Sequence, residues 1–306
     1  MKQNSRTNFQ ADLKMASNTI VNDTPSLETK SRRKLIIHPP GFSFADLAND
    51  LRKLVRYRDL LYTLSVHRVK VRYKQSLLGA SWAIIQPLAM VIILTAIFSF
   101  IVRMPSEGLP YVLFIYVALL PWNYLSTSLT TSTNGLVNHA NLITKVYFPR
   151  EILPLTYVVA ALFDFLIAST VLIVLLLYYR APLTVNLIYV LPIMAILTLF
   201  AIGTALVLSA VQVRFRDVGV AVPIAMQIWM FASPVLYPLA AVPVRFRSIY
   251  QLNPMAGILE GLRRVVLHGA PPDMTALSIS AVISIGLLMI AYGYFKRVEA
   301  TMADVI

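Results

Sequence analysis

The sequence predicts an all-α integral membrane protein, and this prediction rests on its composition and its long charge-free runs. Of the 306 residues, 58% are hydrophobic and 13% are charged, whereas soluble domains carry roughly 25% charged residues. Mean hydropathy is +0.69. A soluble domain needs more polar surface than this composition supplies. Soluble, disordered and coiled-coil classes are therefore excluded for most of the chain.

Six apolar runs are each long enough to cross the hydrocarbon core of a bilayer, which takes about 20 residues. All must be helical, because backbone groups in lipid need hydrogen-bond partners within their own segment. These runs cover residues 83–102, 109–129, 152–179, 187–213, 218–244 and 274–295. An even number of spans places both termini on the same side of the membrane.

The charge distribution indicates that this side is the cytoplasm. Fifteen of the 27 Lys and Arg residues lie within residues 1–82, and positive charge holds a terminus in the cytoplasm. The other basic residues divide evenly between the two sides. Residues 1–43 are polar, lack the apolar region of a cleavable signal peptide and are expected to be disordered. Residues 79–300 form the six-span domain, and residues 301–306 a short cytoplasmic tail.

Three segments are predicted to be helical without crossing the membrane. Residues 44–78 place leucines at helical spacing between basic residues, which favours an amphipathic helix on the inner membrane surface. Residues 134–151 form a polar cytoplasmic connector. Residues 245–267 are apolar but too short and too charged to span, and they follow a proline-rich stretch. An outer re-entrant helical hairpin before the last span fits this pattern.

The sequence offers little material for catalysis. It has no Cys, its four His residues lie in four different segments, and no metal site is expected. A membrane-embedded transferase acting on lipid-linked sugars would need a cluster of acid, base or metal-binding groups. A secondary carrier usually has more spans and paired intramembrane charges. None of the 11 Gly residues is followed by Lys, so a phosphate-binding GxxxxGK[ST] loop is absent.

Four motifs in order resemble the membrane subunit of type-2 ABC exporters of lipid-linked polysaccharides, the group that handles O-antigen, capsule and teichoic acid. They are VRYKQSLLGASWAIIQPL, ANLITKVYFPREILPL, VRFRDVG and NPMAGILEGLRRVVL, which begin at residues 71, 140, 213 and 253. The resemblance covers residues 45–300. It implies a homodimer in the bacterial inner membrane with two separate ATPase subunits, which bind ATP and Mg, and no nucleic-acid partner. The implied cargo is an undecaprenyl-linked polysaccharide, with O-antigen preferred to capsule or teichoic acid.

The resemblance further implies that the connector is a coupling helix that fits a groove of the ATPase subunit. Aromatic side chains would supply buried area, and basic side chains charge complementarity. Pro149 would stop this helix and Glu151 would cap the next. The alternative is an ordinary cytoplasmic loop. The contact residues would be Asn141, Thr144, Lys145, Tyr147, Phe148 and Arg150.

A basic run directly before the first span marks the place where a lipid-linked pyrophosphate would enter from the cytoplasm. Arg binds phosphate oxygens bidentately and Lys acts as a point charge. On a helix, Arg68 and Arg72 share one face, and Lys70 and Lys74 lie on nearly the opposite face. The alternative role is contact with lipid headgroups.

Polar and aromatic groups within the spans complete the candidate residues. Asp164 is the sole ionisable residue deep within a predicted span, and a structural hydrogen bond to another helix is the favoured role. Sugar rings stack on aromatic rings, so aromatic side chains could line a channel, although Trp and Tyr also enrich at membrane interfaces. The channel-lining candidates are Trp82, Phe98, Phe100, Tyr124, Trp229, Phe231 and Tyr237.

Overall fold

The computed structural model describes residues 56–74, 76–101 and 108–305. The chain divides into two compact units, Met1–His38 and Pro39–Ile306, and every described residue belongs to the second. The expectations for residues 1–43 and for the first part of the interface helix, up to residue 55, lie outside the described residues.

The described residues form helices joined by turns and loops, and they contain no β-strand. The all-α class is therefore confirmed. The α-helices are α3 (Arg58–Tyr73), α4 (Trp82–Thr95), α5 (Tyr111–Thr133), α6 (Ala140–Lys145), α7 (Ile152–Tyr178), α8 (Val190–Arg214), α9 (Val218–Ala232), α10 (Val244–Gln251), α11 (Pro254–Leu267) and α12 (Met274–Val305). Short helical turns precede α4, α6, α8 and α10, and a π-helical turn, Ala96–Ile101, continues α4.

Five helical segments are long and apolar enough to cross a membrane: Gly79–Ser99, Tyr111–Thr133, Ile152–Tyr178, Val185–Arg214 and Met274–Glu299. They lie close to five of the six predicted spans, which establishes a multi-pass membrane protein.

The fifth predicted span, residues 218–244, differs from the expectation, because α9 ends at Ala232. Ser233 has extended backbone angles, as expected for a residue that precedes a proline, and Pro234 has no N–H to donate to the helix. The 15 residues of α9 rise by about 22 Å, short of the roughly 30 Å hydrocarbon core.

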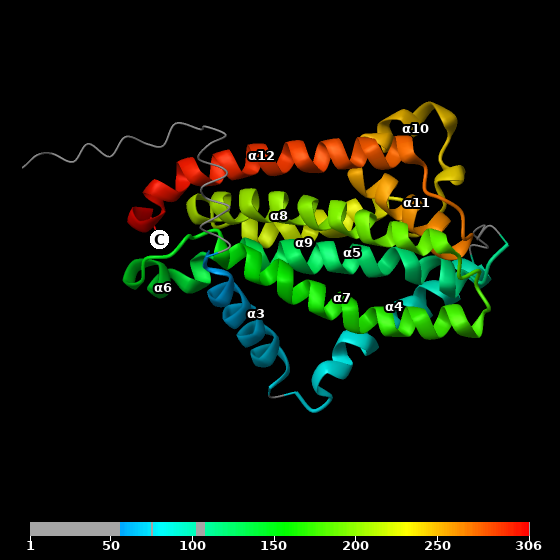
Figure 1. Ribbon diagram of the computed structural model, residues 1–306, viewed down its shortest axis with the longest axis horizontal. Coiled ribbons are helices and arrows are strands. Elements are labelled where there is room, and N and C mark those ends of the chain that lie inside the picture. Colours follow the sequence, from blue (N-terminus) through cyan, green and yellow to red (C-terminus); the bar gives the residue numbers. More distant parts are fainter. Residues whose placement is uncertain (1–55, 75, 102–107, 306) are drawn as a thin grey trace, which may run out of the picture. The chain divides into compact units, whose positions relative to one another are not determined.

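Within this unit, successive long helices alternate in direction (Figure 1). Helix α6 and the end of α12 lie at one end of the bundle, and α10 and α11 lie at the other. The central helix is α5, which is packed against α4, α7, α8, α9 and α11. Its apolar side chains, such as Phe114, Tyr116 and Leu125, form much of the main core. A second core at the α6 end joins residues of α6, α7, α8 and α12.

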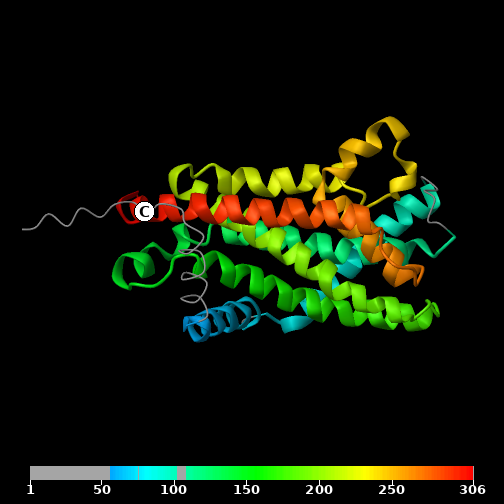
Figure 2. The same ribbon diagram turned by 45° about the horizontal axis from the view of Figure 1, so that its top comes forward.

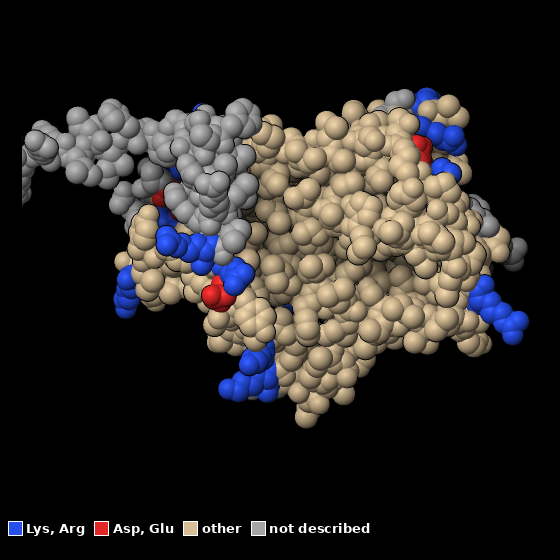
Figure 3. Space-filling view, in the orientation of Figure 1, with Lys and Arg blue, Asp and Glu red and all other residues tan. Residues whose placement is uncertain are grey.

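Charged side chains are distributed as a membrane protein requires. On the face in Figure 3, Lys, Arg, Asp and Glu gather near the two ends of the long helices and along α3, and uncharged residues form the broad band between the ends. An apolar band of this kind can contact lipid without a desolvation cost for charge.

The segment predicted as a re-entrant hairpin folds as two helices, α10 and α11, which stand at one end of the bundle in both views (Figure 2). The Asn253 side chain begins α11 by accepting a hydrogen bond from the Met255 N–H at 3.1 Å, and Pro254 occupies the first turn, where its missing N–H costs nothing. Helix α11 is almost wholly buried against α5, α8 and α12. The helical form of the segment therefore agrees with the prediction.

The connector between the second and third predicted spans, residues 134–151, is shorter and more irregular than predicted. Helix α6 ends at Lys145, and Val146 is already extended, so Pro149 does not stop it. Glu151 occupies the N-cap position of α7, as predicted, but its side chain makes no capping hydrogen bond. Its carboxylate instead pairs with Lys296 of α12.

Candidate functional site

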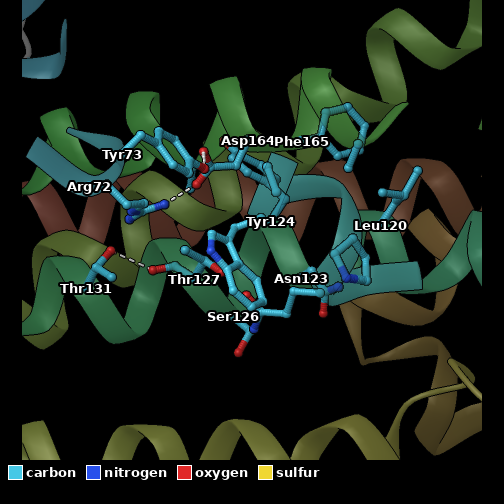
Figure 4. A pocket seen from close by; sticks show the side chains of 16 residues that line it. Arg72, Tyr73, Leu120, Asn123, Tyr124, Ser126, Thr127, Thr131, Asp164 and Phe165 are labelled. Carbon is cyan, nitrogen blue, oxygen red and sulfur yellow. Dashed lines mark hydrogen bonds and ion pairs between the residues drawn. The ribbon is translucent and has the colours of Figure 1, made fainter. Parts of the chain in front are cut away.

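A cavity of about 550 Å³ lies between α3, α4, α5 and α7. It combines an ionic group from α3 and α7 with aromatic rings and polar groups from α4 and α5 (Figure 4). We call it the polar cavity. Its lining residues are Arg72, Tyr73, Trp82, Ala83, Gln86, Pro87, Leu120, Asn123, Tyr124, Ser126, Thr127, Thr131, Ala161, Asp164, Phe165 and Ala168.

Arg72 and Tyr73 converge on Asp164 at one wall of the cavity (Figure 4). The Arg72 guanidinium forms an ion pair with the Asp164 carboxylate, and the Tyr73 hydroxyl donates to Asp164 Oδ1 at 2.6 Å. Burial and the hydrogen bond to Asp164 raise the pKa of Tyr73 to about 12, so Tyr73 remains a neutral donor. The two donors satisfy a carboxylate that would be costly alone in a span. The predicted interhelical hydrogen bond of Asp164 is confirmed.

One turn earlier in α3, Arg68 also faces α7. Its Nε donates to Thr156 Oγ1 at 2.5 Å, and its guanidinium carbon lies 3.5 Å from the centre of the Tyr157 ring. Cation–π contact and hydrogen bonding thus fix the face of α3 that carries Arg68 and Arg72. Lys70 and Lys74 are exposed. The predicted division of the four basic residues between two faces is present, and of the four only Arg72 lines the cavity.

The predicted coupling residues divide into exposed and internal positions. Asn141, Thr144 and Lys145 are exposed, and Tyr147 is 97% exposed. Phe148 is 6% exposed and belongs to the second core, so its ring is not a free anchor for another chain. The Arg150 guanidinium donates to the Glu299 carbonyl at 2.6 Å.

A partly buried ionic cluster that the sequence did not reveal anchors the connector to α12. Lys296 Nζ lies 2.8 Å from both Glu151 Oε1 and Glu299 Oε2. Glu151 is 1% exposed; burial raises the pKa of its carboxyl, and the charge of Lys296 opposes that rise. The spacing of Lys296 and Glu299 predicts an ion pair within α12. No pattern in the sequence predicts that Glu151 lies beside them.

The aromatic candidates do not form one surface. Trp82 and Tyr124 line the polar cavity. Trp229 packs against Trp122 and Phe200, with ring centres 5.7 and 5.9 Å apart.

The remaining aromatic candidates lie elsewhere. Phe98 stacks on Tyr111, Phe231 is exposed, and Tyr237 lines a separate apolar pocket beside α10. The side chain of Phe100 lies outside the described part of the structure.

Arg263 of α11 is a second feature that the sequence did not reveal. It is 1% exposed and donates to the carbonyls of Pro234 and Val235, each at 2.7 Å, and of Tyr237 at 3.2 Å. Its guanidinium carbon lies 3.9 Å from the Phe114 ring centre. This side chain therefore fixes the loop that follows α9.

Among the described residues, no group of three or more His, Asp and Glu side chains could hold a metal ion. The lining of the polar cavity offers a ligand one cation, one anion, hydroxyl and amide groups, and ring faces.

Comparison with known proteins finds a matching family and several named relatives. The family described as ABC-2 type transporter matches residues 59–267. The chain is 30% identical over 256 residues to the O-antigen export system permease protein RfbA of Myxococcus xanthus, covering 83% of this chain and 98% of that protein. It is 28% identical to an RfbA of Klebsiella pneumoniae, over 81% of this chain and 95% of that protein.

A further relative is the polysialic acid transport protein KpsM of Escherichia coli, at 24% identity over 78% of this chain and 93% of that protein. The family match includes the helix that carries Arg72, all of the polar cavity and the α10–α11 segment. This chain belongs to the ABC-2 type transporter membrane family.

Proposed function

We propose that this chain is the permease subunit of an ATP-driven exporter that moves an undecaprenyl-linked O-antigen polysaccharide across the bacterial inner membrane. The observation that carries the proposal is similarity along 98% of a relative named as an O-antigen export permease. Capsular polysaccharide is the second candidate cargo, because a polysialic acid transport protein is also related, at the lower identity of 24%.

Loss of the chain from its host tests the cargo. We expect O-antigen to disappear from the cell surface and its lipid-linked form to accumulate on the cytoplasmic face, since synthesis would continue without export. Immunoblots of surface glycan and extraction of lipid-linked glycan measure this. If surface O-antigen is unchanged and capsule is lost, the cargo is capsular polysaccharide and the O-antigen assignment is wrong.

The proposed topology has six spans with both termini in the cytoplasm. Helix α9 would be the fifth span, because it continues the alternation of helix directions (Figure 1). Since α9 is shorter than the hydrocarbon core, the loop that follows it would complete the crossing. Helix α3 would lie at the inner membrane surface, with Lys70 and Lys74 toward headgroups. Helices α10 and α11 would re-enter the outer leaflet, and the exposed apolar side chains of α10, such as Val244 and Ile249, would contact lipid.

Cysteine labelling tests this topology on a chain that has no native Cys. Tyr147, at 97% exposure, follows α6, and the exposed Arg245 lies in the first turn of α10. Helices α6 and α10 lie at opposite ends of the bundle (Figure 1). We expect Arg245→Cys to react with a membrane-impermeant maleimide in intact spheroplasts and Tyr147→Cys to react only after permeabilisation. Labelling of both positions in intact spheroplasts would contradict the six-span arrangement.

The chain would act as a homodimer with two ATPase subunits, which bind ATP and Mg. The exposed part of the connector, from Asn141 to Tyr147, is the proposed contact with the ATPase subunit. Phe148, Arg150 and the Glu151–Lys296–Glu299 cluster would hold that surface against α7 and α12, so that movement of the ATPase reaches both helices. Phe148 would therefore support the contact from inside the chain.

Substitutions in the connector should separate docking from folding. Lys145→Glu combined with Tyr147→Ala removes charge and an exposed ring, and we expect at least a tenfold loss of co-purified ATPase subunit, since central aromatic anchors contribute about 2 kcal/mol or more. Membrane insertion should be unchanged. The matched control, Arg214→Glu, alters an exposed basic residue outside the connector. Equal retention of the ATPase by both variants would overturn the assignment.

At the polar cavity, Arg72 would bind the pyrophosphate of the lipid-linked substrate, and Arg68, Lys70 and Lys74 would add positive potential around it. Trp82 and Tyr124 would contact the cargo within the cavity. The other aromatic candidates, Phe98, Phe100, Trp229, Phe231 and Tyr237, are proposed to line the later part of the path.

A further inference from the structure

Two amide side chains face the polar cavity without a partner in the described parts of the chain. Gln86 belongs to α4 and Asn123 to α5, and both line the cavity. Each lies well inside a helix that is apolar enough to span a membrane. An amide that lacks a hydrogen bond in an apolar environment costs free energy. Gln86 is exposed and Asn123 is half-buried, so both amides are open to a molecule that enters the cavity.

The groups around these amides differ in kind. Ser126 and Thr127 add hydroxyl groups from α5, and Trp82 adds a ring that is half exposed. The wall formed by Arg72 and Asp164 carries the charge (Figure 4). One side of the cavity is thus ionic, and another combines neutral donors and acceptors with a ring face.

A glycosyl phosphate has the same two-part chemistry. Its phosphate is an anion that a guanidinium can bind. The adjoining sugar presents hydroxyl groups, each both donor and acceptor, and C–H faces that pack on aromatic rings. An amide matches a hydroxyl group better than a charged side chain does, because it offers a donor and an acceptor without a strong desolvation cost.

We propose that Gln86 and Asn123 form a subsite for the first sugar of the lipid-linked glycan, the sugar joined directly to the carrier phosphate. This inference rests on the proposed export function. It adds that these two side chains help to determine which glycan the exporter accepts. The 550 Å³ volume falls within the range of roughly 300–1,000 Å³ for small-ligand sites. Asp164 forms an ion pair with Arg72, and the phosphate would compete with Asp164 for that guanidinium.

The test uses two probes on the permease assembled with its ATPase subunit. One probe is a short-chain polyprenyl pyrophosphate that carries a single hexose, and the other is the same lipid pyrophosphate without sugar. The readout is the probe concentration that gives half-maximal stimulation of ATPase activity. For the wild-type complex we expect a lower value with the sugar-bearing probe.

Removal of either amide should weaken binding of the sugar-bearing probe alone. For Gln86→Leu and for Asn123→Leu we expect about a fivefold rise in the half-maximal concentration of that probe, the equivalent of one neutral hydrogen bond of about 1 kcal/mol. The value for the sugarless probe should stay unchanged. Thr127→Val, which preserves side-chain shape, provides a milder variant if a leucine variant fails to assemble. Gln251→Leu, on α10 and away from the cavity, is the matched control.

Three results would overturn the subsite. Equal shifts for both probes would show a general defect of the cavity, and no shift for either probe would show that water satisfies the amides. A wild-type complex that responds equally to both probes would show that the cavity does not recognise the first sugar. By contrast, a wild-type complex that responds to neither probe would contradict the proposed function itself.

Discussion

Replacing Arg263 with leucine is expected to cause the largest loss of stability of any single substitution considered for this chain. The change removes the donor to three backbone carbonyls, of which those of Pro234 and Val235 are 2.7 Å away. Buried acceptors that lose their donor cost about 1–3 kcal/mol each. The ring contact with Phe114 would be lost as well. We expect about 3 kcal/mol or more in total.

Thermal unfolding of the purified protein in detergent measures this loss. A change of 3 kcal/mol corresponds to a fall in melting temperature of roughly 6–12 °C for a chain of this size. Arg264→Leu is the matched control, because Arg264 is partly exposed and its replacement should alter the melting temperature little. Similar melting temperatures for both variants would show that Arg263 does not hold the loop after α9.

Replacing Arg72 with glutamine should produce the largest change in apparent substrate affinity. A hydrogen bond to a charged group is worth roughly 1.5–3 kcal/mol, so the half-maximal concentration of lipid-linked substrate should rise tenfold or more. The same change leaves Asp164 without its cation, which could disturb the spans independently of substrate. The double variant Arg72→Gln with Asp164→Asn removes both charges and separates these effects.

If Arg72 binds phosphate, the double variant should be as defective as the single variant in substrate-stimulated ATPase activity. Lys74→Gln added to Arg72→Gln should deepen the defect, because positive potential around the cavity falls further. Arg214→Gln, an exposed basic residue outside the cavity, should leave the half-maximal concentration unchanged. Recovery of normal affinity in the double variant would show that Arg72 serves only to neutralise Asp164.

The helical class and most spans could be predicted because apolar length is a local property of the sequence. The end of α9 was harder to place, since the residues after Ala232 remain apolar and only Ser233 and Pro234 interrupt the helix. The same limit applies to α6, whose end at Lys145 precedes the proline that was expected to stop it.

The site was predicted less completely because its contacts join residues far apart in the chain. The intramembrane position of Asp164 predicted a partner, but only the packing of α3 on α7 identifies Arg72 and Tyr73. Phe148 resembles an exposed anchor in sequence, yet it fills the second core. Arg263 and Glu151 looked like ordinary charges beside a helix, and their burial depends on loops and helices distant in sequence.

Reconstituted transport tests the central claim most directly. The measurement is the ATP-dependent appearance of a lipid-linked glycan on the opposite face of proteoliposomes that contain this chain and its ATPase subunit. We expect movement only when both proteins and ATP are present, and a strong reduction with Arg72→Gln. Movement at the same rate without ATP, or without this chain, would contradict its role as the membrane path of an ATP-driven exporter.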